Sequence, residues 1–217
     1  MTVVKLALFF TFARFLVYFF YYTPFLYQNI LLISAIGSLL IGSLGSLYQQ
    51  GLKRLLAYAS ISQVGFALFG LWCHSIEGII SSLVFFTIYI FVSLAIFAIL
   101  LNVESFYKGD SLLYISDLSC FSRFNISISA FLSIFLLSMA GIPPLSGFFS
   151  KVFIFISTTG LFYYGFTIGI IFLSTINAFV YFKLIKILWS DRVDDSILED
   201  SSGFQGFFFI ENWSMIG

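Results

Sequence analysis

The sequence predicts an all-α integral membrane protein, because its charge is low, its hydropathy is high and its apolar runs are long. Of its 217 residues, 60% are hydrophobic and 9% are charged, whereas a soluble domain carries about 25% charged residues. Mean hydropathy is +1.06, and apolar runs that reach the roughly 20 residues needed to cross a bilayer recur along the chain. In lipid each span must satisfy its own backbone hydrogen bonds, and uninterrupted runs of this length do so as helices.

Hydropathy and turn residues together predict about six transmembrane helices in a domain of residues 1–189. The expected spans lie near 3–22, 28–48, 53–73, 78–102, 126–157 and 161–188. Polar or helix-breaking residues mark the first four connections. The tail at 190–217 contains DRVDDSILEDSSG, which is too polar to cross, and the short segment GFFFIENW, which we expect at the interface.

The start of the chain and its composition indicate an organellar protein. The opening MTVVKLALFF has no Arg- and Ser-rich leader and no small-residue cleavage site, so we interpret the first apolar run as a span. Phe occurs 31 times and Tyr 12 times, against three Pro. This skew toward residues with A/T-rich codons is typical of an A/T-rich organellar genome.

Lys and Arg residues predict the orientation, since positive charge accumulates on the inner side of a membrane. With six spans, all connections that carry Lys or Arg fall on one side, and the connections at 23–27, 74–77 and 158–160 carry none. The residues on the charged side are Lys53, Arg54, Lys108, Arg123, Lys183, Lys186 and Arg192. We expect both termini on the inner (matrix or cytoplasmic) side. Cys73 and Cys120 then lie on opposite sides, so no disulfide is expected between them.

Three cations remain inside the predicted spans: Lys5, Arg14 and Lys151. A cation in hydrocarbon costs at least ~2.5–3.5 kcal/mol, so it faces protein or water, or its stem reaches the head groups. For Lys5, reaching the head groups is the alternative to a functional role. For Arg14, which lies in mid-span, the alternative is a structural ion pair or a helix cap.

Lys151 follows a predicted break in the fifth span. Pro143 and Pro144 remove two backbone donors, so the helix should break near Gly141. Such breaks at membrane depth are tolerated where they line a hydrated cavity, and they commonly frame ion sites. Lys151 lies about two helical turns after Pro144 and so projects from nearly the same face. Gly147, one turn earlier, should leave room for water or a partner side chain; the alternative is a proline kink with an interfacial lysine.

A lysine in this position can carry a proton, because burial disfavours its charged form and a nearby carboxylate favours it. No acidic residue lies well inside a predicted span: Glu77 and Glu104 sit at span ends, and the others lie in loops or the tail. We therefore expect the partner acid to come from another polypeptide.

Three stretches resemble the antiporter-like membrane subunits of respiratory complex I (NADH:ubiquinone oxidoreductase), most closely the subunit 2 group. They are GLKRLLAYASISQVGFALFGL at 51–71, LSMAGIPPLSGFFSKVFIF at 137–155 and VVKLALFFTFARFLVYF at 3–19. Gly-Ile-Pro-Pro followed by Gly-Phe-Phe-x-Lys is typical of subunit 2. Subunit 4 typically has Glu in place of the lysine and subunit 5 has Lys-Asp, whereas Val152 follows Lys151 here.

The resemblance implies a proton-translocating subunit built from inverted five-helix repeats, of which this chain holds the last helix of the first and all of the second. It implies that Lys151 is the lysine of the broken helix and Lys5 the central lysine, both acting as proton carriers. The supporting residues implied by the matching stretches are Arg14, Gly141, Pro143, Pro144, Gly147, Lys53, Tyr58, Ser60, Ser62 and Gln63. For Tyr58, Ser60, Ser62 and Gln63, interhelical hydrogen bonding is the structural alternative.

The sequence also departs from the family. The first seven or so helices and a final helix are absent, and Gln63 stands where many relatives have His, which argues against a proton relay at that position. The start at Met1 and the complete second repeat favour a split mitochondrial gene, with a separate chain supplying the N-terminal helices. We expect the mitochondrial inner membrane with both termini on the matrix side, and other complex I membrane-arm subunits and lipids as partners, but no nucleic acid.

No cofactor or metal site is expected in this chain. His74 lacks companion ligands, and neither a phosphate loop nor a cysteine cluster is present. The resemblance implies that NADH, FMN, iron–sulfur clusters and ubiquinone bind elsewhere in the complex, so the chain would not be catalytic alone. Two alternatives stay open: a subunit of a Mrp-type cation/proton antiporter, and a structural membrane-arm piece that does not pump.

Overall fold

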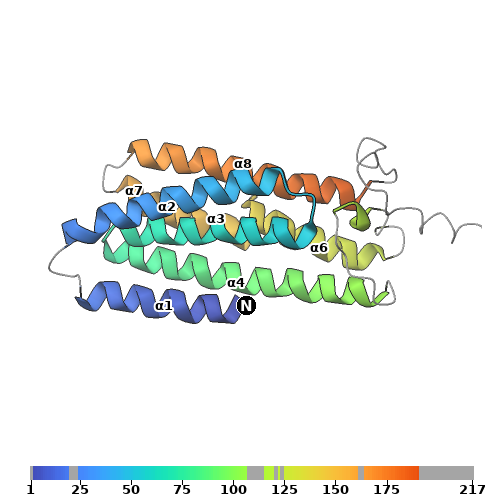
Figure 1. Ribbon diagram of the computed structural model, residues 1–217, viewed down its shortest axis with the longest axis horizontal. Helices are drawn as coiled ribbons and strands as arrows, with labels where there is room; N and C mark the ends of the chain where they lie inside the picture. Colours follow the sequence, from blue (N-terminus) through green and yellow to red (C-terminus); the bar gives the residue numbers. More distant parts are fainter. Residues whose placement is uncertain are drawn as a thin grey trace, which may run out of the picture.

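The computed structural model describes residues 2–19, 24–106, 115–119, 122, 125–160 and 164–190, which form a bundle of helices (Figure 1). The elements are α1 (Thr2–Phe19), α2 (Pro24–Leu47), α3 (Leu52–Trp72), α4 (Ile76–Phe106), the short 3-10 helix η1 (Ile115–Leu118), α6 (Ile126–Ala140), α7 (Ser146–Thr159) and α8 (Tyr164–Leu188). This confirms the all-α class. The expected interfacial residues of the tail, Phe207, Phe208, Phe209 and Trp213, lie outside the described residues.

Among the described residues, four helices are long and apolar enough to cross a membrane: Tyr27–Leu47, Leu52–Trp72, Ile76–Val103 and Tyr164–Leu188. They match the spans predicted near 28–48, 53–73, 78–102 and 161–188 within a few residues. The span predicted near 126–157 is two helices, α6 and α7, separated where the break was expected. The span predicted near 3–22 corresponds to α1, which has 18 residues.

Small residues bring α2 against α3, which lies at the centre of the bundle. A Cβ at Gly42 would lie 2.5 Å from the backbone nitrogen of Ser62, and one at Gly45 would lie 2.6 Å from the Tyr58 ring. Glycines of this kind let membrane helices approach closely. The other face of α3 packs against α4, and α4 packs against α7. Helix α3 contacts α7 and α8 as well, so four helices surround it.

Helix α1 lies at the margin of the bundle, where it packs mainly against α4. Its first turn lies beside the middle of α4 rather than at an end of the bundle (Figure 1). Lys5, in that turn, is therefore near mid-depth.

Four of the Lys and Arg residues predicted to lie on one side of the membrane are described by the structure, and they lie toward one end of the bundle. Lys53 and Arg54 open α3, and Lys183 and Lys186 lie in the last turns of α8, while the connection at 74–77 lies at the other end (Figure 1). Lys108, Arg123, Arg192 and Cys120 lie outside the described residues. Which membrane side each end faces stays a prediction.

Candidate functional site

Helix α6 ends in a turn that requires glycine. Gly141 has φ +87° and ψ +44°, in the left-handed region, where a side chain is disfavoured. The Ile142 N–H donates to the Leu137 carbonyl (3.3 Å) and the Gly141 N–H donates to the Ser138 carbonyl (3.1 Å). This pair of bonds is a Schellman motif, which satisfies the carbonyls of Leu137 and Ser138.

The two prolines leave the next two carbonyls without their helical donors. In a continued helix, the carbonyls of Met139 and Ala140 would accept from the N–H groups of residues 143 and 144, but both are prolines and have none. Buried carbonyls without a donor are costly inside a membrane. The break therefore creates two acceptors that another group must satisfy.

Lys151 supplies the missing donors. It is 5% exposed, and its Nζ donates to the carbonyl of Ala140 at 2.9 Å and to that of Met139 at 3.2 Å. These carbonyls are the negative end of the α6 dipole, which favours a cation. The Phe66 ring lies 5.4 Å from Nζ, in cation–π range. Among the described residues, two carbonyls and an aromatic face thus hold the amine, and the expected carboxylate from another polypeptide stays a prediction.

Gly147 lets α7 begin directly on the last turn of α6. A Cβ at this position would collide with the Ser138 carbonyl oxygen. The Gly147 N–H donates to Ser138 Oγ (3.3 Å). We expected Gly147 to leave room for water or a side chain; it does line the cavity described next, but the space beside it is filled by the backbone of α6.

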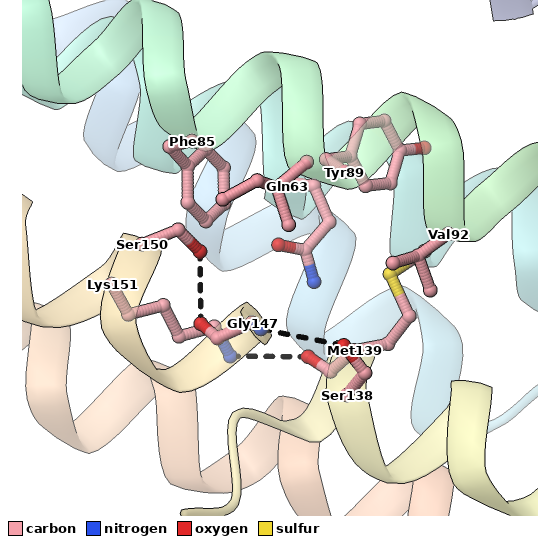
Figure 2. Close-up of a pocket in the computed structure, with 10 residues that line it drawn as sticks. Gln63, Phe85, Tyr89, Val92, Ser138, Met139, Gly147, Ser150 and Lys151 are labelled. Atoms are coloured by element: carbon pink, nitrogen blue, oxygen red, sulfur yellow. Dashed lines mark hydrogen bonds between the residues drawn. The ribbon is translucent and has the colours of Figure 1, made fainter. Parts of the chain in front are cut away.

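A small cavity adjoins the amine of Lys151. It has about 10 Å³ available to water centres, which is near the minimum for one water molecule. Its polar lining comes from Gln63, Tyr89, Ser138, Ser150 and Lys151, and the rest comes from apolar side chains of α4, from Met139 of α6 and from Gly147 of α7. In Figure 2 the Gln63 amide projects from α3 toward Lys151 and Met139. Gln63 Nε2 also donates to the Tyr181 hydroxyl at 3.5 Å.

Lys5 also contacts helix α3. Its Nζ donates to Ser60 Oγ at 2.8 Å. The half-buried side chain lines a cleft of about 680 Å³ between α1, α3 and α4, whose other lining residues are mostly apolar. Its amine therefore points at protein and not at an end of the bundle.

The remaining predicted residues lie apart from this site. Arg14 is on the exposed surface of α1, with its guanidinium 5.7 Å from the Tyr18 ring, and Lys53 is exposed at the start of α3. Ser62 donates within its own helix to Ala59 (2.7 Å), and Tyr58 packs against Gly45. Pro143 and Pro144 are exposed and act through the N–H groups they lack.

Sequence reasoning missed three side chains of this region: Phe66, Tyr89 and Tyr181. The two phenols are 6% and 1% exposed. A polar aromatic residue inside an otherwise apolar span is a signal that could have identified Tyr89 and Tyr181.

His74 Nδ1 is hydrogen-bonded to the Tyr27 hydroxyl. In the part of the chain that the structure describes, no group of three or more His, Cys, Asp or Glu side chains is arranged to hold a metal.

Comparison with known proteins gives consistent matches. Residues 1–178 match the family described as NADH:quinone oxidoreductase/Mrp antiporter, transmembrane. NADH-quinone oxidoreductase subunit N of Pelagibacter ubique is 38% identical over 200 residues, covering 88% of this chain and 40% of the relative. NADH-ubiquinone oxidoreductase chain 2 of Marchantia polymorpha is 36% identical over 171 residues, covering 79% of this chain and 34% of the relative.

A solved structure shares the fold. One chain of respiratory complex I from Thermus thermophilus with bound NADH matches with a TM-score of 0.76 at 24% identity, covering 89% of this chain and 40% of that chain. This chain thus spans between a third and two fifths of the length of these relatives. Because the family match extends over most of its residues, the chain belongs to the NADH:quinone oxidoreductase/Mrp antiporter family of transmembrane subunits.

Proposed function

We propose that this chain is a proton-translocating part of the membrane arm of NADH:ubiquinone oxidoreductase, with Lys151 and Lys5 as its proton carriers. The observation that carries the proposal is the Lys151 amine, buried at a helix break beside a cavity with room for one water. The relatives named above, all subunits of this oxidoreductase, support the identity of the complex.

The site can hold a charge without fixing it permanently. Two carbonyls, the α6 dipole and the Phe66 ring stabilise the ammonium, while the absence of bulk water disfavours it. The charged and neutral forms of the amine would therefore be close in free energy. A carboxylate on a neighbouring subunit would favour the charged form when it moves closer and the neutral form when it moves away. The chain itself would carry no redox centre, so NADH, FMN, iron–sulfur clusters and ubiquinone would bind to other subunits.

The proposal also includes partners. A separate chain with further helices would pack against the mostly apolar cleft beside Lys5. Other membrane-arm subunits and lipids would complete the surroundings. The mitochondrial relative supports a place in the mitochondrial inner membrane, with both termini on the matrix side.

Two substitutions at residue 151 test the role of the amine. Lys151→Ala removes the amine, and Lys151→Arg keeps a cation that can donate to the carbonyls but cannot release its proton in a protein. The measurement is the number of protons pumped per NADH oxidised by the intact complex in sealed vesicles. We expect both variants to pump less. Normal pumping by Lys151→Arg would show that the amine only caps α6. Normal pumping by both variants would show that the chain is a structural part of the membrane arm and does not pump.

The family also contains Mrp antiporter subunits, so the host assembly needs its own test. Purification of the assembly through this chain should bring down flavin and iron–sulfur clusters in fixed ratio to it. A particle that exchanges cations for protons and lacks these groups would identify the antiporter instead.

A further inference from the structure

We propose that α1 binds one membrane phospholipid, with the lipid phosphate held by Arg14 beside Tyr18 and one acyl chain lying in the cleft that runs from Phe15 to Lys5. The inference goes beyond the function proposed above, because it concerns the margin of the bundle and not the helix break. It joins two neighbouring features of α1: a cation on its exposed surface, and an open, mostly apolar cleft.

The guanidinium of Arg14 needs an acceptor. Arg14 lies on the exposed surface of α1, and in the part of the chain that the structure describes it contacts the Tyr18 ring, 5.7 Å away, and no carboxylate. Tyr18 is itself 71% exposed. A cation in a membrane span persists only with an anion, a backbone acceptor or water. The acceptor for Arg14 therefore comes from outside the described residues.

The depth of Arg14 brings it close to the lipid phosphates. Lys5 lies near mid-depth, and α1 runs from there to the end of the bundle that holds the connection at 74–77 (Figure 1). Arg14 follows Lys5 by nine residues, which is about 13.5 Å along a helix. Half of the hydrocarbon core is about 15 Å, so the guanidinium reaches the head groups while its stem stays in hydrocarbon. Tyr18, one turn further, lies where tyrosine is typical in membrane proteins.

The chemistry of this pair suits a phosphate. A guanidinium donates two parallel N–H bonds to two oxygens of one phosphate, and a tyrosine hydroxyl can donate a further bond. Both side chains are exposed to the same surroundings. A phosphodiester with one negative charge therefore complements the site in charge and in hydrogen bonding.

The cleft adjoins this pair on the surface of α1. It has about 680 Å³ and is lined by Thr11 and Phe15 among others. These two residues precede Arg14 and Tyr18 by three positions, and residues three apart are neighbours on a helix surface. The Thr11 hydroxyl donates to the Leu8 carbonyl of its own helix (3.0 Å), so this wall offers hydrocarbon to a ligand. A chain attached to a phosphate at Arg14 can enter the cleft directly.

The cleft matches an acyl chain in length and in lining. On α1 it extends from Phe15 to Lys5, and ten residues of helix are about 15 Å long, as is the acyl layer of one leaflet. Its volume falls in the range of about 300–1,000 Å³ that is typical of ligand sites. Leu8 and Phe12, in its wall, are 64% and 40% exposed, so the cleft is open to the membrane along its side.

A single lipid would satisfy both features at the spacing that the helix gives them. Its phosphate would pair with Arg14 and its chain would end beside Lys5. The alternative is a partner helix that brings a carboxylate to Arg14 and separate side chains to the cleft. In our proposal the separate chain described above would pack over the lipid, which would fill the space between the two proteins.

Photolabelling of the intact complex tests the place of the acyl chain. The complex is placed in phosphatidylcholine vesicles in which a small share of the lipid carries a photoreactive group in its acyl chain. Mass spectrometry then counts adducts on residues 8–15 of α1 and on the exposed face of α8, which any surrounding lipid touches. We expect more adducts on α1. Leu8→Trp fills the cleft without changing Arg14, and it should lower labelling of α1 to the level of α8.

A diacylglycerol with the same photoreactive chain tests the role of the phosphate. In the unaltered protein, phosphatidylcholine should label residues 8–15 more than diacylglycerol does, on the order of tenfold, because a charge-assisted hydrogen bond is lost without the phosphate. Arg14→Gln should abolish this preference. Arg54→Gln removes an exposed cation at the other end of the bundle, and this matched control should retain the preference.

Each contrary result has a distinct meaning. Equal labelling of α1 and α8, or a phosphate preference that survives Arg14→Gln, would overturn the proposal and show that the arginine only extends to the head groups. Unlabelled α1 together with poor assembly of Arg14→Gln would overturn it in favour of a partner carboxylate. Unchanged labelling in Leu8→Trp would overturn the cleft as the place of the chain. None of these measurements uses proton pumping, so failure of the lipid site and failure of the proposed function are distinguishable.

Discussion

The Lys151 amine donates to the carbonyl oxygen of Ala140, 2.9 Å away, in the position where the backbone of residue 144 would donate if it were not proline. A side chain from α7 thus completes the hydrogen bonding of α6. The helix break and Lys151 therefore depend on each other: the break supplies the acceptors, and the lysine supplies the donor.

Pro144→Ala restores an N–H that can donate to the Ala140 carbonyl. The new backbone bond should compete with the Lys151 amine and extend α6 across the break. We expect slower amide exchange at residues 145 and 146, measured by mass spectrometry of the complex, together with reduced pumping. Slower exchange at unchanged pumping would show that the amine does not need this carbonyl.

Gly141→Ala should destabilise the break. A side chain in the left-handed region costs roughly 1–2 kcal/mol, and the added Cβ would lie 3.0 Å from Lys151 Cδ and 3.1 Å from Nζ. Thermal unfolding of the purified complex, followed through release of this chain, measures the effect. Gly141→Asn should cost less, because Asn tolerates this conformation better; equal losses would point to crowding of Lys151 as the main cause.

Gly147→Ala should be more harmful than an alanine elsewhere in the same part of the chain. Its Cβ would meet the Ser138 carbonyl oxygen, so α7 must move off α6, and overpacking of this kind costs about 1–3 kcal/mol. The amount of chain assembled into the complex measures the loss. Gly165→Ala in α8 is the matched control, since nothing lies within 4 Å of its added Cβ, and a similar loss there would contradict the argument.

The variant Lys5→Arg tests whether Lys5 must release its proton or need only carry a positive charge. Arg can still donate to Ser60, but it retains its proton in a protein. We expect this variant to assemble normally and to pump less, and we expect Lys5→Met to pump less as well. Proton pumping per NADH is the measurement, and normal pumping by Lys5→Arg would remove Lys5 from the proton path.

The sequence predicted the helices and the break near Gly141, because spans follow from hydropathy and the break follows from two adjacent prolines, and the role of Lys151 as a proton carrier stays a prediction. The sequence did not predict what holds Lys151. Within the described residues its amine donates to the Met139 and Ala140 carbonyls, groups that every residue possesses and that lack a backbone donor only where a helix ends, while the acid expected on another polypeptide stays a prediction.

For other residues, too, the sequence alone does not show which groups become neighbours in the folded bundle. Arg14 and Lys5 are both cations in one apolar run, and only the packing of α1 against α4 puts one on the surface and the other against Ser60. Gln63 and Tyr181 lie far apart in the sequence, so their hydrogen bond depends on how α3 and α8 are placed. Spacing along one helix carries no information about such neighbours.

The Schellman turn at Gly141 satisfies Leu137 and Ser138 from the backbone, but the last two carbonyls of α6 depend on a titratable side chain. If that amine leaves to exchange its proton, as the proposed function requires, two carbonyl oxygens lose their donor and can accept a hydrogen bond from a water molecule in its place. Wetting of the gap and movement of charge are therefore coupled by the chemistry of a helix end, and neither step needs a separate moving part.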